Sequence, residues 1–153
     1  MDLILWRHAE ARIAEDGQAD LERALTTKGE RQAQRMADWL NQRIAHSTRI
    51  LVSPALRCQQ TAQALGKNFK TVDALGPDAS GEALLVAARW PESPDPVLIV
   101  GHQPTLGLVA AHLLAGMPQA WSVKKGGVWW LRDRDREDGA RVVLLAVQSP
   151  EYL

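Results

Sequence analysis

Two histidines and two arginines in this sequence have side-chain chemistry that suits a single reaction. They are Arg7, His8, Arg57 and His102, and each lies at or soon after the end of a short apolar segment. A neutral imidazole nitrogen is a good nucleophile toward phosphorus, and an arginine stays charged and binds phosphate bidentately. Because phosphoryl transfer needs mainly positioning and stabilisation of charge on the phosphoryl oxygens, these four residues predict a phosphoryl-transfer site.

Three predicted strands would bring these residues to one place. Residues 2–6, 49–53 and 96–100 are short, apolar segments rich in branched side chains, as buried strands are. In open α/β sheets, ligands bind at the carboxyl ends of the parallel strands. The backbone amides of a helix that starts near Pro54 would add anion-binding groups at this edge.

Helical patterns alternate with these strands. We expect helices over residues 27–45, 53–66, 83–90 and 105–114. The first would open on a capping box from Thr27 to Glu30. The second would have Ser53 as N-cap and Pro54 at its first position, and Thr105 would cap the last.

Further strands are expected over residues 71–72, 121–123, 128–131 and 141–147, with a charged turn over 132–139. The strand 128–131 would place Trp129 and Trp130 on opposite sides of the sheet, one in the core and the other at a rim where a partner could dock. Alternating strands and helices predict an α/β fold with three layers, in which a mostly parallel central sheet carries helices on both faces. The length of the chain suits one compact domain over residues 1–153.

Composition excludes several classes of protein. The formal net charge is zero, so nothing predicts attraction to nucleic acid or to an anionic membrane. No apolar stretch approaches the roughly 18 residues of a membrane span. The single cysteine, Cys58, rules out an intramolecular disulfide and suits a reducing compartment. We therefore expect a cytoplasmic protein, and a monomer.

Other kinds of site have less support. The sequence has neither the G-x-x-x-x-G-K nor the G-x-G-x-x-G pattern of nucleotide-binding loops, and no G-x-S-x-G turn. His8, His102 and Cys58 could bind zinc, but no short-spaced pair of ligands is present.

Three stretches of the chain together resemble the histidine phosphatase superfamily. They are RHAEA (7–11), SPALRCQQTA (53–62) and GHQP (101–104). The size of the chain, the RHAEA start and the RALTTKG stretch (23–29) are most similar to the small SixA-type phosphohistidine phosphatase branch. The resemblance covers essentially the whole chain and implies a phosphoglycerate mutase-like fold.

The resemblance also implies a role for each site residue. His8 would be the nucleophile and would become phosphorylated, while Arg7 and Arg57 would clamp the transferring phosphoryl group. His102 would hydrogen-bond this group from the other side, and Arg23 would add a contact from the long loop. Water would then hydrolyse the intermediate, without a metal or cofactor.

The chain departs from its relatives in ways that bear on the substrate. Many relatives have glycine after the Arg-His pair, where this chain has Ala9. Relatives that act on phosphate monoesters, or as mutases, usually supply a carboxylate acid from a segment inserted after the second motif. Here that segment is short, and Asp73, Asp78 and Glu82 are its candidate carboxylates.

A phosphorylated imidazole needs less proton donation than an alkoxide leaving group. An open site also admits a side chain of a folded protein. We therefore expect the substrate to be a phosphohistidine of a signalling-relay or phosphocarrier protein. Two alternatives stay open. The protein could be a small-molecule phosphomonoesterase that uses Asp78 or Glu82 as its acid, or a non-catalytic module that binds phosphoproteins.

Overall fold

The computed structural model describes residues 1–134 and 141–153, which contain one six-stranded sheet. Its strands are β1 (Asp2–Arg7), β2 (Arg49–Val52), β3 (Lys70–Thr71), β4 (Val97–Gly101), β5 (Val128–Asp133) and β6 (Val142–Gln148). They lie in the order β3-β2-β4-β1-β5-β6. The first four strands in this order are parallel, whereas β5 pairs antiparallel with β1 and β6 antiparallel with β5. This arrangement confirms the predicted, mostly parallel sheet.

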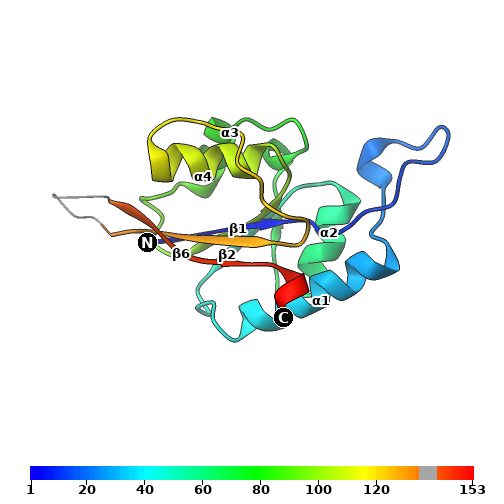
Figure 1. Ribbon diagram of the computed structural model, residues 1–153, viewed down its shortest axis with the longest axis horizontal. Coiled ribbons are helices and arrows are strands. Elements are labelled where there is room, and N and C mark those ends of the chain that lie inside the picture. Colours follow the sequence, from blue (N-terminus) through cyan, green and yellow to red (C-terminus); the bar gives the residue numbers. More distant parts are fainter. Residues whose placement is uncertain (135–140) are drawn as a thin grey trace.

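Four α-helices cover the two faces of the sheet (Figure 1). They are α1 (Thr27–Asn41), α2 (Leu56–Gln63), α3 (Gly81–Ala88) and α4 (Thr105–Ala115), and short 3-10 turns lie at η1 (Asp20–Glu22), η2 (Asp73–Leu75) and η3 (Pro150–Tyr152). Figure 1 shows α3 and α4 on one side of the sheet and α1 on the other. The three predicted layers are therefore present. No helix among the described residues is long and apolar enough to cross a membrane.

Strand β1 lies between two hydrophobic cores. Its side chains alternate, so Ile4 and Trp6 pack with residues of α1 and α2, whereas Leu3 and Leu5 pack with residues of α3 and α4. All four side chains are fully buried, and each such burial contributes about 1.5–3 kcal/mol. The strand that ends at the predicted nucleophile is therefore firmly held on both faces.

The N-cap of the first helix lies one residue earlier than predicted. Thr26, not Thr27, is the N-cap, and its hydroxyl oxygen accepts from Gly29 N at 2.9 Å while the hydroxyl donates to Glu10 Oε2 at 2.8 Å. The helix also ends at Asn41 rather than near Ala45. Glu10 lies 16 residues before Thr26 in the sequence, and its hydrogen bond to the Thr26 hydroxyl favours Thr26 over Thr27 as the cap.

The predicted N-caps of the second and fourth helices are also wrong. α2 begins at Leu56 with Ala55 as N-cap, and Ser53 Oγ lies before the helix, where it contacts His102 Nε2 at 2.7 Å and accepts from Ala55 N at 3.2 Å. α4 has Pro104 as N-cap, and the hydroxyl of Thr105 donates to Ala79 O at 2.7 Å. Both hydroxyls therefore have a partner distant in the sequence, His102 for Ser53 and Ala79 for Thr105.

The third helix starts at Gly81, capped by Ser80, two residues before its predicted start at Ala83. Residues 121–123, predicted as a strand, form an irregular segment. The short strand near 71–72 is β3, at 70–71. Strand β5 extends to Asp133, and residues 135–139 of the predicted turn lie outside the described residues.

The paired tryptophans of β5 do face opposite cores. Trp129 packs beside Trp121, with ring centroids 5.9 Å apart, and Trp130 packs beside Trp39 at 6.2 Å. Both are half-buried, so neither is wholly core and both reach the surface.

Candidate active site

The two predicted histidines meet because their strands are neighbours. Arg7 at the end of β1 is in register with Gly101 at the end of β4, and His8 N donates to Gly101 O at 3.1 Å. The next residues along the two strands are His8 and His102, whose ring centroids lie 5.3 Å apart. Arg57, in the first turn of α2, donates from Nη2 to His102 Nδ1 at 3.4 Å.

The His8 ring is held in one tautomer. Its Nδ1 lies 2.8 Å from the carbonyl oxygen of Ala9, and because a carbonyl oxygen can only accept, Nδ1 carries the proton. In the neutral ring, Nε2 then has the free electron pair. Burial, together with the nearby positive charges of Arg57, Arg7 and Arg23, lowers the pKa of His8 from 6.5 to about 4, against the opposing effect of the bond to Ala9. At neutral pH the ring is therefore uncharged, with Nε2 unprotonated.

His102 has the opposite tautomer. An arginine can only donate, so His102 Nδ1 accepts from Arg57 and Nε2 carries the proton, which it donates to Ser53 Oγ at 2.7 Å. Burial and the neighbouring His8 and Arg57 lower its pKa to about 3. Cys58 lies beside this ring, 3.4 Å from Nε2, but burial raises the pKa of its thiol to about 12. Cys58 is therefore a packed thiol rather than a nucleophile.

Both predicted phosphate-binding arginines have an unused donor. Arg57 is only 3% exposed, and Arg7 donates from Nη1 to Val123 O at 2.9 Å. The Nε atoms of Arg7 and Arg57 are buried, and neither has a hydrogen-bond partner within the described part of the chain. A buried donor without a partner costs about 1–3 kcal/mol, so a ligand that accepted hydrogen bonds from these Nε atoms would offset this cost.

Arg23 is linked to Arg57 through the carboxylate of Asp20, a residue that was not predicted from the sequence. Asp20, in the turn η1, accepts from Arg23 Nε at 2.9 Å and from Arg57 Nη2 at 3.0 Å. Slight burial raises the pKa of Asp20, but the hydrogen bonds from Arg57 and Arg23 outweigh it and bring the pKa below its ordinary value. The only sequence signal was its position three residues before Arg23.

Comparison with known proteins places these residues in a family. The model of the histidine phosphatase superfamily (branch 1) matches residues 3–76. The phosphohistidine phosphatase SixA of Escherichia coli is 32% identical over 124 residues, which are 76% of this chain and 76% of that protein. This chain belongs to the histidine phosphatase superfamily, in its SixA-type branch.

Two further relatives span nearly the whole length of this phosphatase. An uncharacterized protein of Picosynechococcus is 38% identical over 163 residues, covering 100% of this chain and 99% of that one. The structure of a protein histidine phosphatase SixA complexed with tungstate has a TM-score of 0.76 at 23% identity, covering 99% of each chain. The second likeness shows that the phosphatase has the same fold.

The candidate carboxylate acids Asp73, Asp78 and Glu82 all come from the segment between α2 and α4 of this phosphatase. Glu82 lines a cavity between α3 and α4, together with Leu108 and His112. Within the described part of the chain, no hydrogen bond joins Asp73, Asp78 or Glu82 to a site residue. The described residues also contain no group of three His, Cys, Asp or Glu side chains that could hold a metal ion.

Replacement of Asp20 with asparagine should strengthen the binding of inorganic phosphate about fivefold. The carboxylate occupies donors of Arg57 and Arg23 and repels an incoming anion, and a solvent-exposed ion pair is worth up to about 1 kcal/mol. Calorimetric titration with phosphate measures the effect, with Asp16→Asn as control on the same loop. Weaker binding in Asp20→Asn alone would mean that Asp20 holds the arginines in place instead of competing with the ligand.

The acid limb of the pH profile should lie well below the ordinary pKa of histidine. Because the pKa of His8 is about 4, its Nε2 stays unprotonated on acidification until that range. We expect kcat/KM, which reports groups of the free enzyme, to hold from about pH 8 to pH 5 and to fall below about pH 4. Rates on phosphohistidine and on 4-nitrophenyl phosphate, corrected for spontaneous hydrolysis, should share this midpoint. A common midpoint near 6.5 would contradict the assignment.

Proposed function

We propose that this protein is a phosphohistidine phosphatase that removes the phosphoryl group from a histidine of a signalling or phosphocarrier protein. The observation that carries the proposal is the open Nε2 of His8 beside two arginines whose buried Nε donors are unpaired. This combination suits attack on a phosphoryl group and stabilisation of its oxygens. A module that only binds phosphoproteins would need the arginines but not a neutral, oriented imidazole.

In the first step, the Nε2 electron pair of His8 attacks phosphorus. The P–N bond of the substrate breaks, and its electron pair returns to the substrate imidazole, which leaves neutral when its other nitrogen carries a proton. The other ring nitrogen of His8, Nδ1, keeps its proton and donates it in the hydrogen bond to Ala9 O. Arg7 and Arg57 bind the equatorial oxygens of the phosphoryl group, while the Nε2–H of His102 donates to Ser53 Oγ.

In the second step, a water molecule attacks the phosphorus of phosphorylated His8. The P–Nε2 bond breaks, the electron pair returns to Nε2, and the protons of water remain with the released phosphate and solvent. The proposed mechanism uses no metal ion. The tungstate bound by a SixA structure, a tetrahedral oxyanion, supports a phosphoryl pocket in this branch. We propose that the reaction takes place in the cytoplasm, in keeping with the single, buried cysteine.

The leaving group distinguishes this proposal from a phosphomonoesterase. A serine alkoxide needs a proton from a general acid, a contribution of about 10²–10⁴ in rate, and no carboxylic acid contacts the described site except Asp20, which stays ionised. We therefore expect kcat/KM for a histidine-phosphorylated phosphocarrier protein to exceed that for phosphoserine at least about 100-fold.

The test uses phosphate release from a histidine-phosphorylated phosphocarrier protein, from free phosphohistidine and from phosphoserine. Efficient hydrolysis of phosphoserine, lost in Asp78→Asn or Glu82→Gln, would replace the proposal with the monoesterase. Binding of the phosphoprotein without release of phosphate would replace it with a binding module.

A further inference from the structure

A groove of about 450 Å³ extends over the surface from Arg7. Its cationic side chains are Arg7, Lys28, Lys124 and Lys125, and Glu151 is the one carboxylate among the described residues that line it. We call it the basic groove. Four positive charges and one negative charge leave it strongly cationic, although the whole chain is neutral. An adjoining groove along α1 adds Arg31 and Arg35.

The loop that carries two of these lysines is fixed to the catalytic strand. Arg7 Nη1 donates to Val123 O at 2.9 Å, and Gly126 N donates to His8 O at 3.0 Å. Trp6 Nε1 donates to Gly126 O at 3.0 Å from the buried core. These hydrogen bonds hold the backbone of the loop, and they therefore fix where Lys124 and Lys125 lie relative to His8.

The charges of the basic groove are largely available to a partner. Lys28 and Lys125 are exposed, and neither forms a salt bridge with a described residue. Lys124 pairs with Glu151 at 2.7 Å, but both side chains are more than half exposed, and such a pair exchanges easily for another. The site thus offers at least two uncommitted cations next to the arginine that binds phosphate.

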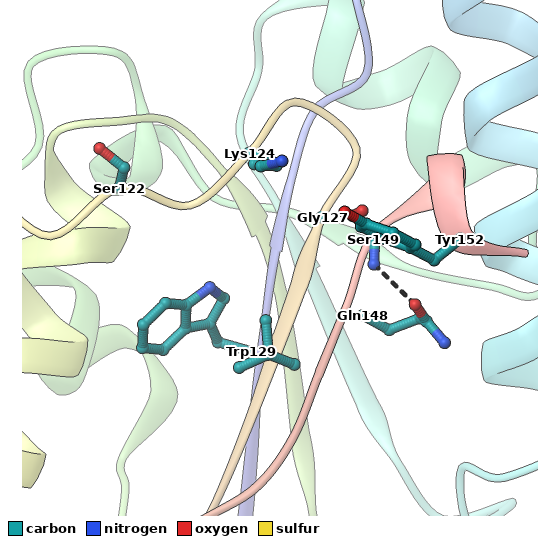
Figure 2. Close-up of a pocket in the computed structure, with 8 residues that line it drawn as sticks. Ser122, Lys124, Gly127, Trp129, Gln148, Ser149 and Tyr152 are labelled. Atoms are coloured by element: carbon teal, nitrogen blue, oxygen red, sulfur yellow. Dashed lines mark hydrogen bonds between the residues drawn. The ribbon is translucent and has the colours of Figure 1, made fainter.

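A smaller pocket of about 220 Å³ continues the basic groove past Lys124. It is lined by Trp129, Val147 and Tyr152, and it shares Ser122, Lys124 and Ser149 with the basic groove. Figure 2 shows Lys124, Trp129 and Tyr152 entering from three different segments of the chain. Exposed aromatic side chains next to charge are typical anchors in protein interfaces.

The surface near Arg57 has the opposite charge. The loop between β1 and α1 carries Glu15, Asp16, Asp20 and Glu22, all exposed, which outnumber its cations Arg12 and Arg23, and Asp20 contacts Arg57. A long polyanion such as RNA would be attracted by the basic groove but repelled by this loop. A folded protein with one acidic patch fits the arrangement better, because it can place its patch on one flank of the site only.

We propose that the basic groove binds an acidic surface of the substrate protein and thereby brings its phosphohistidine to His8. This inference rests on the proposed function. The acidic side chains pair with Lys28 and Lys125, and an apolar side chain of the substrate enters the pocket at Trp129. The groove makes the phosphatase select phosphohistidines that have acidic residues nearby.

The test compares two histidine peptides, phosphorylated with phosphoramidate, that differ only in flanking residues: four Glu in one and four Gln in the other. For the parent enzyme we expect kcat/KM to be about tenfold higher for the Glu peptide at low ionic strength, and the preference to shrink with added salt because exposed charges are screened. In Lys28→Glu/Lys125→Glu the preference should fall below about twofold or reverse. Free phosphohistidine should be hydrolysed equally by both enzymes.

The matched control is Lys67→Glu/Lys70→Glu, which changes the net charge equally but lies at and before β3, at the other edge of the sheet from β6. It should keep the preference for the Glu peptide. Equal kcat/KM for both peptides in the parent enzyme, or the same loss in both double variants, would overturn the docking inference. So would a single-stranded RNA that competes with the Glu peptide through Lys28 and Lys125.

The outcome for free phosphohistidine separates the two proposals. If the parent enzyme hydrolyses it, the proposed reaction stands, whatever the peptides show. If it hydrolyses neither this compound nor a peptide, the proposed function is wrong, and the docking inference is decided by binding. Fluorescence anisotropy of the labelled, unphosphorylated peptides should then show tighter binding of the Glu peptide to the parent than to Lys28→Glu/Lys125→Glu; equal binding would overturn it.

Discussion

Replacement of His8 with alanine should lower kcat/KM for phosphohistidine by about 10⁴-fold or more, the scale of the loss when an enzyme nucleophile is removed. No other described side chain offers an equivalent atom, because His102 Nδ1 faces Arg57 and its Nε2 carries a proton toward Ser53. The buried thiol of Cys58 stays protonated. Phosphate release under single-turnover conditions measures the effect.

The loss in His8→Ala should not reflect unfolding. His8 makes a single side-chain hydrogen bond, to Ala9 O, so the thermal midpoint should change little. The control is His46→Ala, which removes an exposed histidine far along the sequence and should retain full activity. Retention of more than about a tenth of the parent activity in His8→Ala would assign the nucleophile elsewhere.

Replacement of Arg57 with lysine should lower kcat/KM by about 10²–10³-fold, the usual cost of removing a donor that stabilises transition-state charge. Lysine keeps the positive charge but lacks the planar guanidinium group. It therefore also lacks the buried Nε–H, which has no hydrogen-bond partner among the described residues. It also loses the bond to His102 Nδ1, which sets the tautomer of that ring. The effect should appear mostly in kcat, since ground-state attraction is partly retained.

The matched variant is Arg49→Lys, another arginine whose guanidinium contacts a backbone carbonyl and a serine away from the site. It should change stability but not kcat. Thermal unfolding and phosphate affinity of Arg57→Lys separate loss of fold from loss of catalysis. An Arg57→Lys enzyme within threefold of the parent kcat would contradict the assigned clamp.

The arrangement of the candidate catalytic residues was predictable because it follows from strand geometry. His8 and His102 come directly after apolar strands, and parallel neighbours deliver such residues to one edge. The helix starts were less predictable, because Thr26, Ser53 and Thr105 use their hydroxyls according to partners distant in sequence. Local helix propensity does not determine which of these hydrogen bonds forms.

The surroundings of the site depend even more on contacts between distant segments. Asp20 bridges Arg23 and Arg57 only because the loop folds back onto α2. Residues 121–123 have the pattern of a strand, yet Val123 O accepts from Arg7, and the chain there is a loop. The basic groove also combines residues from α1 and the loop after α4, more than 90 positions apart, so no window of sequence displays its charge.

The most direct test of this account is a rapid-quench pulse with a ³²P-labelled, histidine-phosphorylated phosphocarrier protein. The reaction is stopped in alkali, and the label on the enzyme is mapped by mass spectrometry and phosphorus NMR. Because His8 Nδ1 donates to Ala9 O, we expect label to appear transiently on His8 at Nε2 and to disappear as phosphate is released. Phosphate release without label on His8, at equal rates in His8→Ala, would contradict the account.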